Sequence, residues 1–210
     1  MSSAYDAIVL GLGAMGSATA YHLARRGTRV LGLDAYPRGH TQGSSHGRSR
    51  IIREAYFEAP EYVPLVQRAY HLWRELEAEC GQALLTLTGG LNLGAPESEL
   101  VTGALASARQ HQLPYEYLNA AEITARFPGF RPPEDAVAVY EPNAGILAPE
   151  ACVGAHLDLA MRHGAVLQFN EPVRHWSADG AGVRVDTAQG TYQAARLVIA
   201  AGPWSAAVLA

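Results

Sequence analysis

Cysteine is scarce in this chain of 210 residues, which contains only Cys80 and Cys152. Two cysteines so far apart cannot build a disulfide scaffold, and a zinc site needs more ligands at closer spacing, so no metal site is expected. Long apolar runs and the basic start of a secretory leader are also missing from the sequence. We therefore expect no transmembrane helix and no signal peptide, and we predict a cytoplasmic protein.

A strong excess of charge of one sign is missing too. The net charge is −4, and the 16 lysine and arginine residues are scattered along the chain. This distribution argues against a nucleic-acid groove and against a polybasic membrane patch, so no nucleic-acid or membrane partner is expected. The hydrophobic content of 49% suits one globular domain or somewhat more.

The most informative pattern lies between Asp6 and Asp34. An apolar run leads into three glycines with the GxGxxG spacing, a helical run follows as far as Arg26, and a second apolar run ends at Asp34. The order strand, glycine turn, helix, strand and acidic residue is the context in which this motif binds a dinucleotide. The alternative is a glycine-rich turn in some other βαβ protein.

Each residue type in this pattern has a chemical reason. Gly11 permits the tight turn, Gly13 lets a pyrophosphate approach the backbone, and Gly16 lets helix and strand pack closely. The N–H groups at the helix start and the helix dipole attract the phosphates. Asp34 is expected to accept hydrogen bonds from the adenosine ribose, and its charge disfavours NADP. The cofactor-binding residues predicted in this stretch are Gly11, Gly13, Ala14, Met15, Gly16, Asp34 and Ala35.

The rest of the chain alternates between helical and strand patterns. Helices are predicted at 61–80, 97–112, 120–126 and 149–163, and a loop at 35–50. Strands are predicted at 84–87, 91–93, 115–118, 136–140, 166–169, 173–176, 183–187, 191–193 and 196–201. We expect an α/β fold in which strands 6–10, 30–33 and 197–200 lie side by side, interrupted by an insertion near 84–141.

A second constellation follows Asp34 by about a dozen residues and runs from Gly43 to Arg53. Arg50 and Arg53 are three residues apart and flank two isoleucines. At helical or turn spacing the two arginines would share a face and could converge on one pocket. The alternative is a solvated basic loop, although two isoleucines argue against full exposure.

These residues resemble the family of monomeric sarcosine oxidase, N-methyltryptophan oxidase and pipecolate oxidase, among the D-amino-acid-oxidase-like flavoproteins. The matching motifs are the Gly11–Gly16 fingerprint, Gly43-Ser-Ser-His-Gly, Ser49-Arg50-Ile-Ile-Arg53, Ala55-Tyr56, Glu61-Tyr-Val-Pro64, Leu72-Trp73, Glu141-Pro-Asn-Ala-Gly145 and Gly202-Pro-Trp204. The resemblance implies a Rossmann-like FAD-binding domain of the GR2-type βαβ class with an inserted part of a mixed-sheet substrate domain. It places the FAD-binding domain at residues 1–83 and 146–210, and the incomplete substrate-domain segment at 84–145.

The resemblance also implies an activity. The cofactor would be FAD, bound noncovalently or through a cysteine thioether, in an oxidoreductase acting on CH–NH bonds. A secondary amino acid, N-methyl or cyclic, would transfer hydride to flavin N5 and leave as an imine, and O2 would be reduced to H2O2. The partners would be a small amino-acid substrate and O2, and the complete protein would be a monomer.

Residue roles follow from the same resemblance. Arg50 matches an arginine against the flavin ring, and Arg53 matches the arginine that binds the substrate carboxylate. His46 and Ser45 match residues lining the flavin, and Val173 matches a backbone contact to the adenine. The catalytic residues predicted in this way are Arg50, Arg53 and His46. The further cofactor-binding residues are Ser44, Ser45, Arg50, Val173, Gly202 and Trp204.

Other functions stay open at this point. They are a glycine or D-amino-acid oxidase, an NAD-dependent dehydrogenase, and a non-catalytic dinucleotide-binding module. The resemblance covers only the first half of the family pattern, and the last residues, 205–210, read as a helix start without a C-cap. We therefore expect an incomplete chain that is inactive alone.

Overall fold

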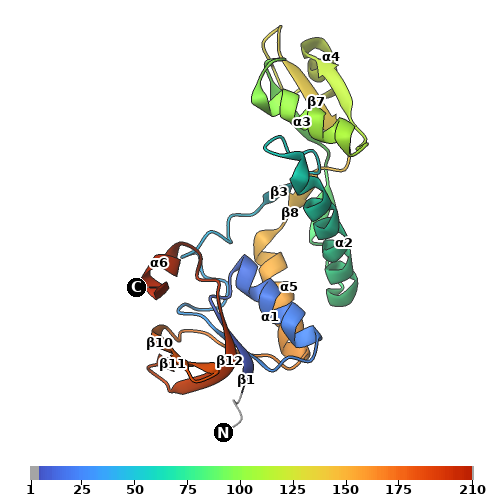
Figure 1. The fold of residues 1–210 in the computed structure, drawn as a ribbon. Helices are drawn as coiled ribbons and strands as arrows, with labels where there is room; N and C mark the ends of the chain where they lie inside the picture. The colour runs from blue at the N-terminus through green and yellow to red at the C-terminus, as the bar shows by residue number, and fades with distance from the viewer. Residues whose placement is uncertain (1–4, 210) are drawn as a thin grey trace. The chain divides into compact units, whose positions relative to one another are not determined.

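A computed structural model of the protein describes residues 5–209 and divides the chain into two compact units (Figure 1). The first comprises Met1–Ser49 with Ala148–Ala210, and the second comprises Arg50–Leu147. Residues 50–83, which the sequence suggested would belong to the FAD-binding domain, are part of the second unit. The domain boundaries based on the resemblance stay a prediction.

The first unit is built on a six-stranded sheet in the order β10-β11-β12-β1-β2-β9. Its strands are β1 (Tyr5–Leu10), β2 (Val30–Leu33), β9 (Val166–Gln168), β10 (Val173–Asp179), β11 (Gly182–Thr187) and β12 (Thr191–Ile199). β1 pairs in parallel with β2 on one side and with β12 on the other, and β2 pairs in parallel with β9. The expectation that the strands near 6–10, 30–33 and 197–200 lie side by side is therefore confirmed.

Helix α1 (Ala14–Arg25) connects β1 to β2 and packs on them. Its buried face carries small residues next to one aromatic ring, namely Gly16, Ser17, Ala20, Tyr21 and Ala24. The small side chains let the helix lie close to the sheet. Gly27, just beyond the helix, has φ +82° and donates its N–H to Ala24, as expected for a C-terminal glycine.

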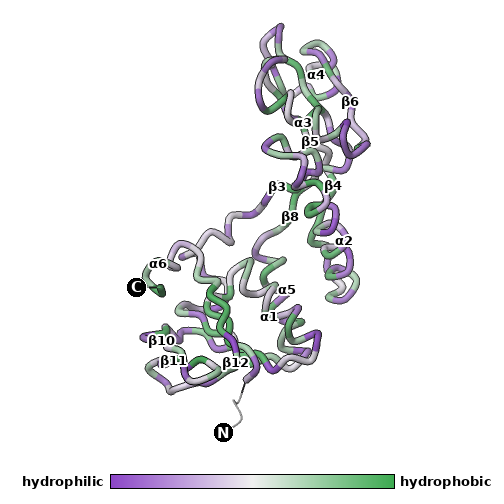
Figure 2. The backbone as a smooth tube through the Cα atoms, in the orientation of Figure 1, coloured by the Kyte–Doolittle hydropathy of each residue, from purple (hydrophilic) through white to green (hydrophobic). Residues whose placement is uncertain are grey.

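Helix α5 (Pro149–Arg162) lies alongside α1 and leads into β9 (Figure 1). β1 and β2 are apolar and buried over residues 7–10 and 30–33, and green stretches run through this part of the sheet in Figure 2. One apolar cluster joins Ile8 and Leu10 of β1 to Leu31 and Leu33 of β2 and to residues of β11. Near-continuous hydrophobic strands of this kind are typical of a parallel sheet buried on both faces.

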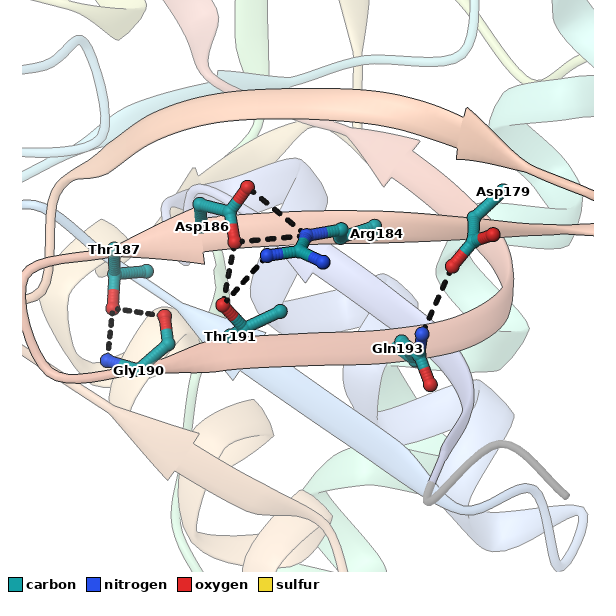
Figure 3. Close-up of polar contacts among 7 residues, drawn as sticks. All are labelled: Asp179, Arg184, Asp186, Thr187, Gly190, Thr191 and Gln193. Atoms are coloured by element: carbon teal, nitrogen blue, oxygen red, sulfur yellow. Dashed lines mark hydrogen bonds and ion pairs between the residues drawn. The ribbon is translucent and has the colours of Figure 1, made fainter. Parts of the chain in front are cut away.

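Strands β10, β11 and β12 form an antiparallel meander at one end of this sheet. Its register is held partly by exposed polar side chains (Figure 3). The Arg184 guanidinium donates to Asp186, and the Thr191 hydroxyl donates across the strands to the same carboxylate at 2.5 Å. The bond from Thr191, followed by the one from Arg184, lowers the pKa of the Asp186 carboxyl. Gln193 likewise donates to Asp179 at 2.9 Å.

The second unit contains two three-stranded antiparallel sheets. The first has the order β3-β8-β4, and its strands are β3 (Arg50–Ile52), β8 (Gly145–Leu147) and β4 (Leu85–Leu87). Helix α2 (Val63–Cys80), which follows a short 3-10 turn, η1 (Pro60–Tyr62), packs on it. Ile52, Val66 and Leu85 form the buried centre of this packing.

The second of these sheets has the order β5-β7-β6 and helices on both faces. Its elements are β5 (Gly90–Gly94), α3 (Glu99–Gln110), β6 (Glu116–Asn119), α4 (Ala120–Arg126) and β7 (Val137–Glu141). Val139 packs with α3, whereas the neighbouring Ala138 packs with Ile123 of α4. Alternate residues of β7 therefore face opposite helices, as strand geometry requires. None of the helices within residues 5–209 is long and apolar enough to cross a membrane.

Three details differ from the sequence predictions. The strands predicted at 191–193 and 196–201 are one strand, β12, because pairing with β1 and β11 continues through Ala194. β3 and β8 were not predicted, since three residues give no measurable period. The second isoleucine of the arginine stretch, Ile52, is buried, but Ile51 is 75% exposed.

A buried histidine lies where α1 and α5 pack together. His156 is 7% exposed, and the rings of Tyr21 and His22 lie 5.6 and 6.4 Å from its own ring. Burial, followed by the charge of nearby His22, lowers the pKa of His156 to about 4. The folded protein therefore favours the neutral imidazole.

We predict that this histidine makes folding acid-sensitive. The folded pKa lies below the unfolded value, so stability is lost as pH falls below about 6.5, and the full loss is reached below the folded pKa of about 4. Between pH 7 and 5 the loss from this group is about 2 kcal/mol. Urea unfolding at the two pH values should show this loss, His156→Gln should reduce it, and exposed His71→Gln should not. An equal loss in all three proteins would contradict the assignment.

Candidate functional site

A cavity of about 840 Å³ lies in the first unit, at the carboxyl ends of β1, β2 and β12. Ligands of doubly wound α/β sheets bind at this edge. The wall includes Leu10, Leu33 and Ile199 at the strand ends, and the glycine turn that follows β1. It also includes parts of the loop after Asp34, of α5 and of the segment 169–173.

The glycine turn has the geometry that the sequence predicted. Gly11 has φ +87°, and a side chain there would also meet the backbone of Ala200. A side chain at Gly16 would overlap the carbonyl oxygen of Gly11. Both positions therefore require glycine for the turn itself.

Asp34 holds this turn from the end of β2. The side chain is buried, and its carboxylate accepts the N–H of Leu12 at 2.8 Å and the N–H of Tyr36 at 3.0 Å. His40 Nε2 lies 3.4 Å from the same carboxylate. Asp34 also lines the cavity, and each carboxylate oxygen can accept more than one hydrogen bond. It can therefore serve the fold and a bound ribose together.

The loop after Asp34 is tied to the start of α1. Ser45 accepts the N–H of Ala14 at 2.9 Å through its hydroxyl oxygen, and the N-cap residue Gly13 contributes no side chain of its own. The serine therefore caps the helix from 31 positions along the chain. Ser45 also lines the cavity, where its hydroxyl group can donate to a ligand.

A second tie joins this loop to α5. Glu150 accepts the N–H of Gly47 at 2.7 Å, and the backbone of Gly47 is the main cause of a lowered pKa of the Glu150 carboxyl. The chain turns sharply here, since Arg48 has φ 62°. A carboxylate that collects backbone N–H groups stabilises such a turn. Sequence reasoning missed Glu150, whose only signal was its place in the first turn of a helix.

Most of the predicted cofactor residues line the cavity. These are Gly11, Gly13, Ala14, Met15, Asp34, Ala35, Ser44, Ser45, Val173, Gly202 and Trp204. Gly16 lies behind the turn and acts through packing. His46 belongs to the same unit but does not line the cavity. Arg50 and Arg53 belong to the second unit.

Arg53 has an acidic and aromatic environment within its unit. Its terminal nitrogen lies 3.0 and 3.1 Å from the two carboxylate oxygens of Glu58, and its guanidinium lies 5.1 and 5.0 Å from the ring centres of Tyr56 and Phe57. Among the described residues, no acceptor reaches its buried Nε. The guanidinium thus already pairs with one carboxylate and keeps an unused donor.

A buried carboxylate fixes the backbone that follows Arg53. Glu141 is 2% exposed, and one of its oxygens accepts the N–H groups of Glu54 and Ala55 at 3.0 and 2.7 Å. Its other oxygen accepts from the Asn92 amide at 2.8 Å. Sequence reasoning listed Glu141 only as part of a motif and gave it no role.

Arg50 and Arg53 do not have the helical or turn spacing that the sequence suggested. Residues Arg50–Ile52 form strand β3, so the helical or turn periodicity that would place Arg50 and Arg53 on one face does not apply. Pairing of Arg50 with Leu147 of β8 draws this segment into a sheet. The spacing of Arg50 and Arg53 therefore does not indicate that they share one pocket.

The sheet order, glycine turn and acidic residue together are typical of a Rossmann-type, dinucleotide-binding α/β protein. A family model described as "FAD dependent oxidoreductase" (DAO) matches residues 6–210. The chain therefore belongs to the DAO family of FAD-dependent oxidoreductases, whose cofactor is FAD.

Curated relatives agree with this family. The chain is 52% identical over 209 residues to a monomeric sarcosine oxidase of Streptomyces avermitilis. This match covers 100% of the chain and 54% of the relative. It is 38% identical over 205 residues to an N-methyl-L-tryptophan oxidase of Salmonella heidelberg, which covers 98% of this chain and 55% of the relative. The chain thus spans about half the length of the curated relatives it matches.

Solved structures show the same fold. NikD, described as an unusual amino acid oxidase essential for nikkomycin biosynthesis, superposes with a TM-score of 0.89 at 33% identity, over 100% of this chain and 54% of NikD. Glycine oxidase from Geobacillus kaustophilus superposes with a TM-score of 0.82 at 26% identity, over 96% of this chain and 56% of that enzyme. The predicted fold class is confirmed.

We predict that Asp34→Ala weakens both the fold and cofactor binding. The substitution leaves the buried N–H of Leu12 without its acceptor, which costs about 1–3 kcal/mol of unfolding free energy. FAD binding should weaken about tenfold or more through the lost ribose contact. Urea unfolding and fluorescence titration with FAD measure the two effects. Asp6→Ala, which removes an exposed carboxylate paired with Arg29, is the control and should change FAD binding little. An unchanged free energy of unfolding in Asp34→Ala would contradict the structural role of the hydrogen bond from Leu12 to Asp34.

Proposed function

We propose that the complete protein is an FAD-dependent oxidase of a secondary amino acid, N-methyl or cyclic. The observation that carries the proposal is the cavity, whose wall joins the glycine turn, the Asp34 carboxylate and the loop around Ser45 in one unit. The family membership and the sarcosine and N-methyltryptophan oxidases among the relatives support the substrate class.

The residues of the cavity fit FAD. The glycine turn leaves room for a pyrophosphate at the start of α1, and Asp34 offers acceptors for the adenosine ribose. Ala14, Met15, Ser44 and Ser45 would contact the phosphate-bearing part, and Val173 the adenine. Bound FAD would supply the oxidising chemistry, which is acceptance of a hydride from the substrate and return of the two electrons to O2 as H2O2.

Arg53 is proposed to bind the substrate carboxylate. Its guanidinium fork suits two parallel hydrogen bonds to a carboxylate, and its existing pair with the Glu58 carboxylate supports the proposal. The substrate carboxylate would replace Glu58 or share the guanidinium with it. The unused Nε donor supports the arrangement in which the substrate carboxylate and Glu58 share the guanidinium.

Arg50 and His46 keep the roles that the resemblance implies. Arg50 would supply a fixed positive charge that favours a reduced, negatively charged flavin, as preorganised charges do in catalysis. His46 would line the flavin and would be positioned by the loop that Glu150 holds at Gly47. The roles of Arg50 and His46 are proposals. We also propose that the complete protein is cytoplasmic and monomeric.

Two measurements on the complete protein test the proposed function. It should purify with bound flavin that absorbs near 450 nm, and sarcosine or pipecolate should produce one H2O2 for each amino acid consumed. A colourless protein that needs added NAD would contradict the proposal. Flavin without peroxide from any secondary amino acid would leave only the cofactor assignment standing.

We predict that Arg53→Lys in the complete protein chiefly raises KM. A lysine keeps the charge but loses the planar fork, so KM for sarcosine should rise about tenfold while kcat changes much less. Steady-state kinetics measures both values. Arg68→Lys is the matched control, because Arg68 lies in an exposed pair with Glu75 at 3.6 Å. N-methylethylamine, which lacks the carboxylate, should be a poor substrate for the wild type, and equal turnover of it would contradict the role of Arg53.

A further inference from the structure

Glu171 is a buried carboxylate in the wall of the cavity. The residue is 1% exposed and lies between β9 and β10. Its backbone N–H donates to the carbonyl oxygen of Asp34 at 2.8 Å, so Glu171 is a direct spatial neighbour of the proposed ribose ligand. Glu171 lies outside the strands, so the pairing of the sheet does not require a buried, charged side chain at this position.

The two oxygens of this carboxylate have different surroundings. Oε1 accepts the hydroxyl groups of Thr187 and Tyr192, each at 2.7 Å. Oε2 is buried as well, yet no donor within residues 5–209 reaches it. Leaving a buried carboxylate oxygen without a partner is unfavourable, and native proteins rarely do so without a reason.

The hydrogen bonds on Oε1 determine which oxygen remains for a ligand. The Thr187 oxygen also accepts the N–H of Gly190 at 3.2 Å (Figure 3) and the N–H of Gln189 at 3.1 Å, which fixes its place in the β11–β12 turn. Tyr192 is held in addition by Gln168 at 2.8 Å. Oε1 is thus committed to the meander, and Oε2 is the acceptor left over. Glu171 lines the cavity, so Oε2 is the oxygen of this side chain that a ligand there can use.

The chemistry of FAD indicates which group could donate a hydrogen bond to Glu171 Oε2. In FAD the base is attached to the same ribose that Asp34 is proposed to hold, and the exocyclic amine of adenine is the donor on the edge of that base. We propose that Glu171 Oε2 accepts a hydrogen bond from the adenine amino group and so selects adenine over bases that carry a carbonyl there. The proposal rests on the proposed function, because it requires a dinucleotide in the cavity.

ADP and IDP test this selection directly. IDP has a carbonyl oxygen where ADP has the amine, and that oxygen is repelled by a carboxylate. Calorimetric titration of the chain should show ADP binding about tenfold or more tighter than IDP. Glu171→Gln keeps an acceptor for Thr187 and Tyr192 but replaces Oε2 by an amide donor, so the ratio should fall to about one or reverse.

The controls separate recognition from folding. Tyr192→Phe removes a donor from Oε1 and should lower stability without changing the ADP to IDP ratio. A wild-type ratio near one overturns the inference even if Glu171→Gln does not fold, and so does an unchanged ratio in a folded Glu171→Gln protein. FAD binding would survive either result. If the wild type bound neither FAD nor ADP, the proposed function would fail, and the inference with it.

Discussion

The hydrogen bond from the N–H of Leu12 to the carboxylate of Asp34, 2.8 Å long, is the constraint on which the cavity depends. It joins the turn after β1 to the end of β2, next to the bond from the N–H of Gly11 to the carbonyl of Leu33 at the same length. The turn can lie close to Ala200, just after β12, only because Gly11 has no side chain. A side chain at Gly11 would meet the backbone of Ala200. One buried carboxylate therefore holds the turn and also lines the cavity.

The loop after Asp34 is held by contacts within the same unit. Ser45 binds the start of α1, Glu150 binds Gly47, and Arg38 lies 2.7 Å from Asp158 of α5. A wall that is already ordered spares a ligand the entropy cost of ordering it. This explains why a loop with few apolar residues can still belong to a binding site. It also links α5 to the cavity, although the helix carries no residue of the glycine motif.

The sequence predicted the fold wherever apolar periodicity or a glycine carried the signal. The βαβ unit ending at Asp34 follows from its pattern, and α4 begins and ends at the predicted residues. Strands β3 and β8 are too short to show a period, and a strand replaces the helical or turn spacing that was expected for Arg50 and Arg53. Glu150 and Glu171 were missed because their partners lie 103 and 16 or more residues away. Such contacts come from tertiary structure, which one sequence without an alignment does not reveal.

FAD is proposed to bind in the cavity formed by the glycine turn, Asp34 and the loop around Ser45. Amide hydrogen exchange of the chain with and without FAD tests it most directly, because exchange reports local opening residue by residue. FAD should slow exchange in peptides covering 11–17, 34–47, 171–174 and 200–205, and leave 90–94 and 137–141 of the second unit unchanged. Protection confined to the second unit, or none at all at saturating FAD, would contradict the account.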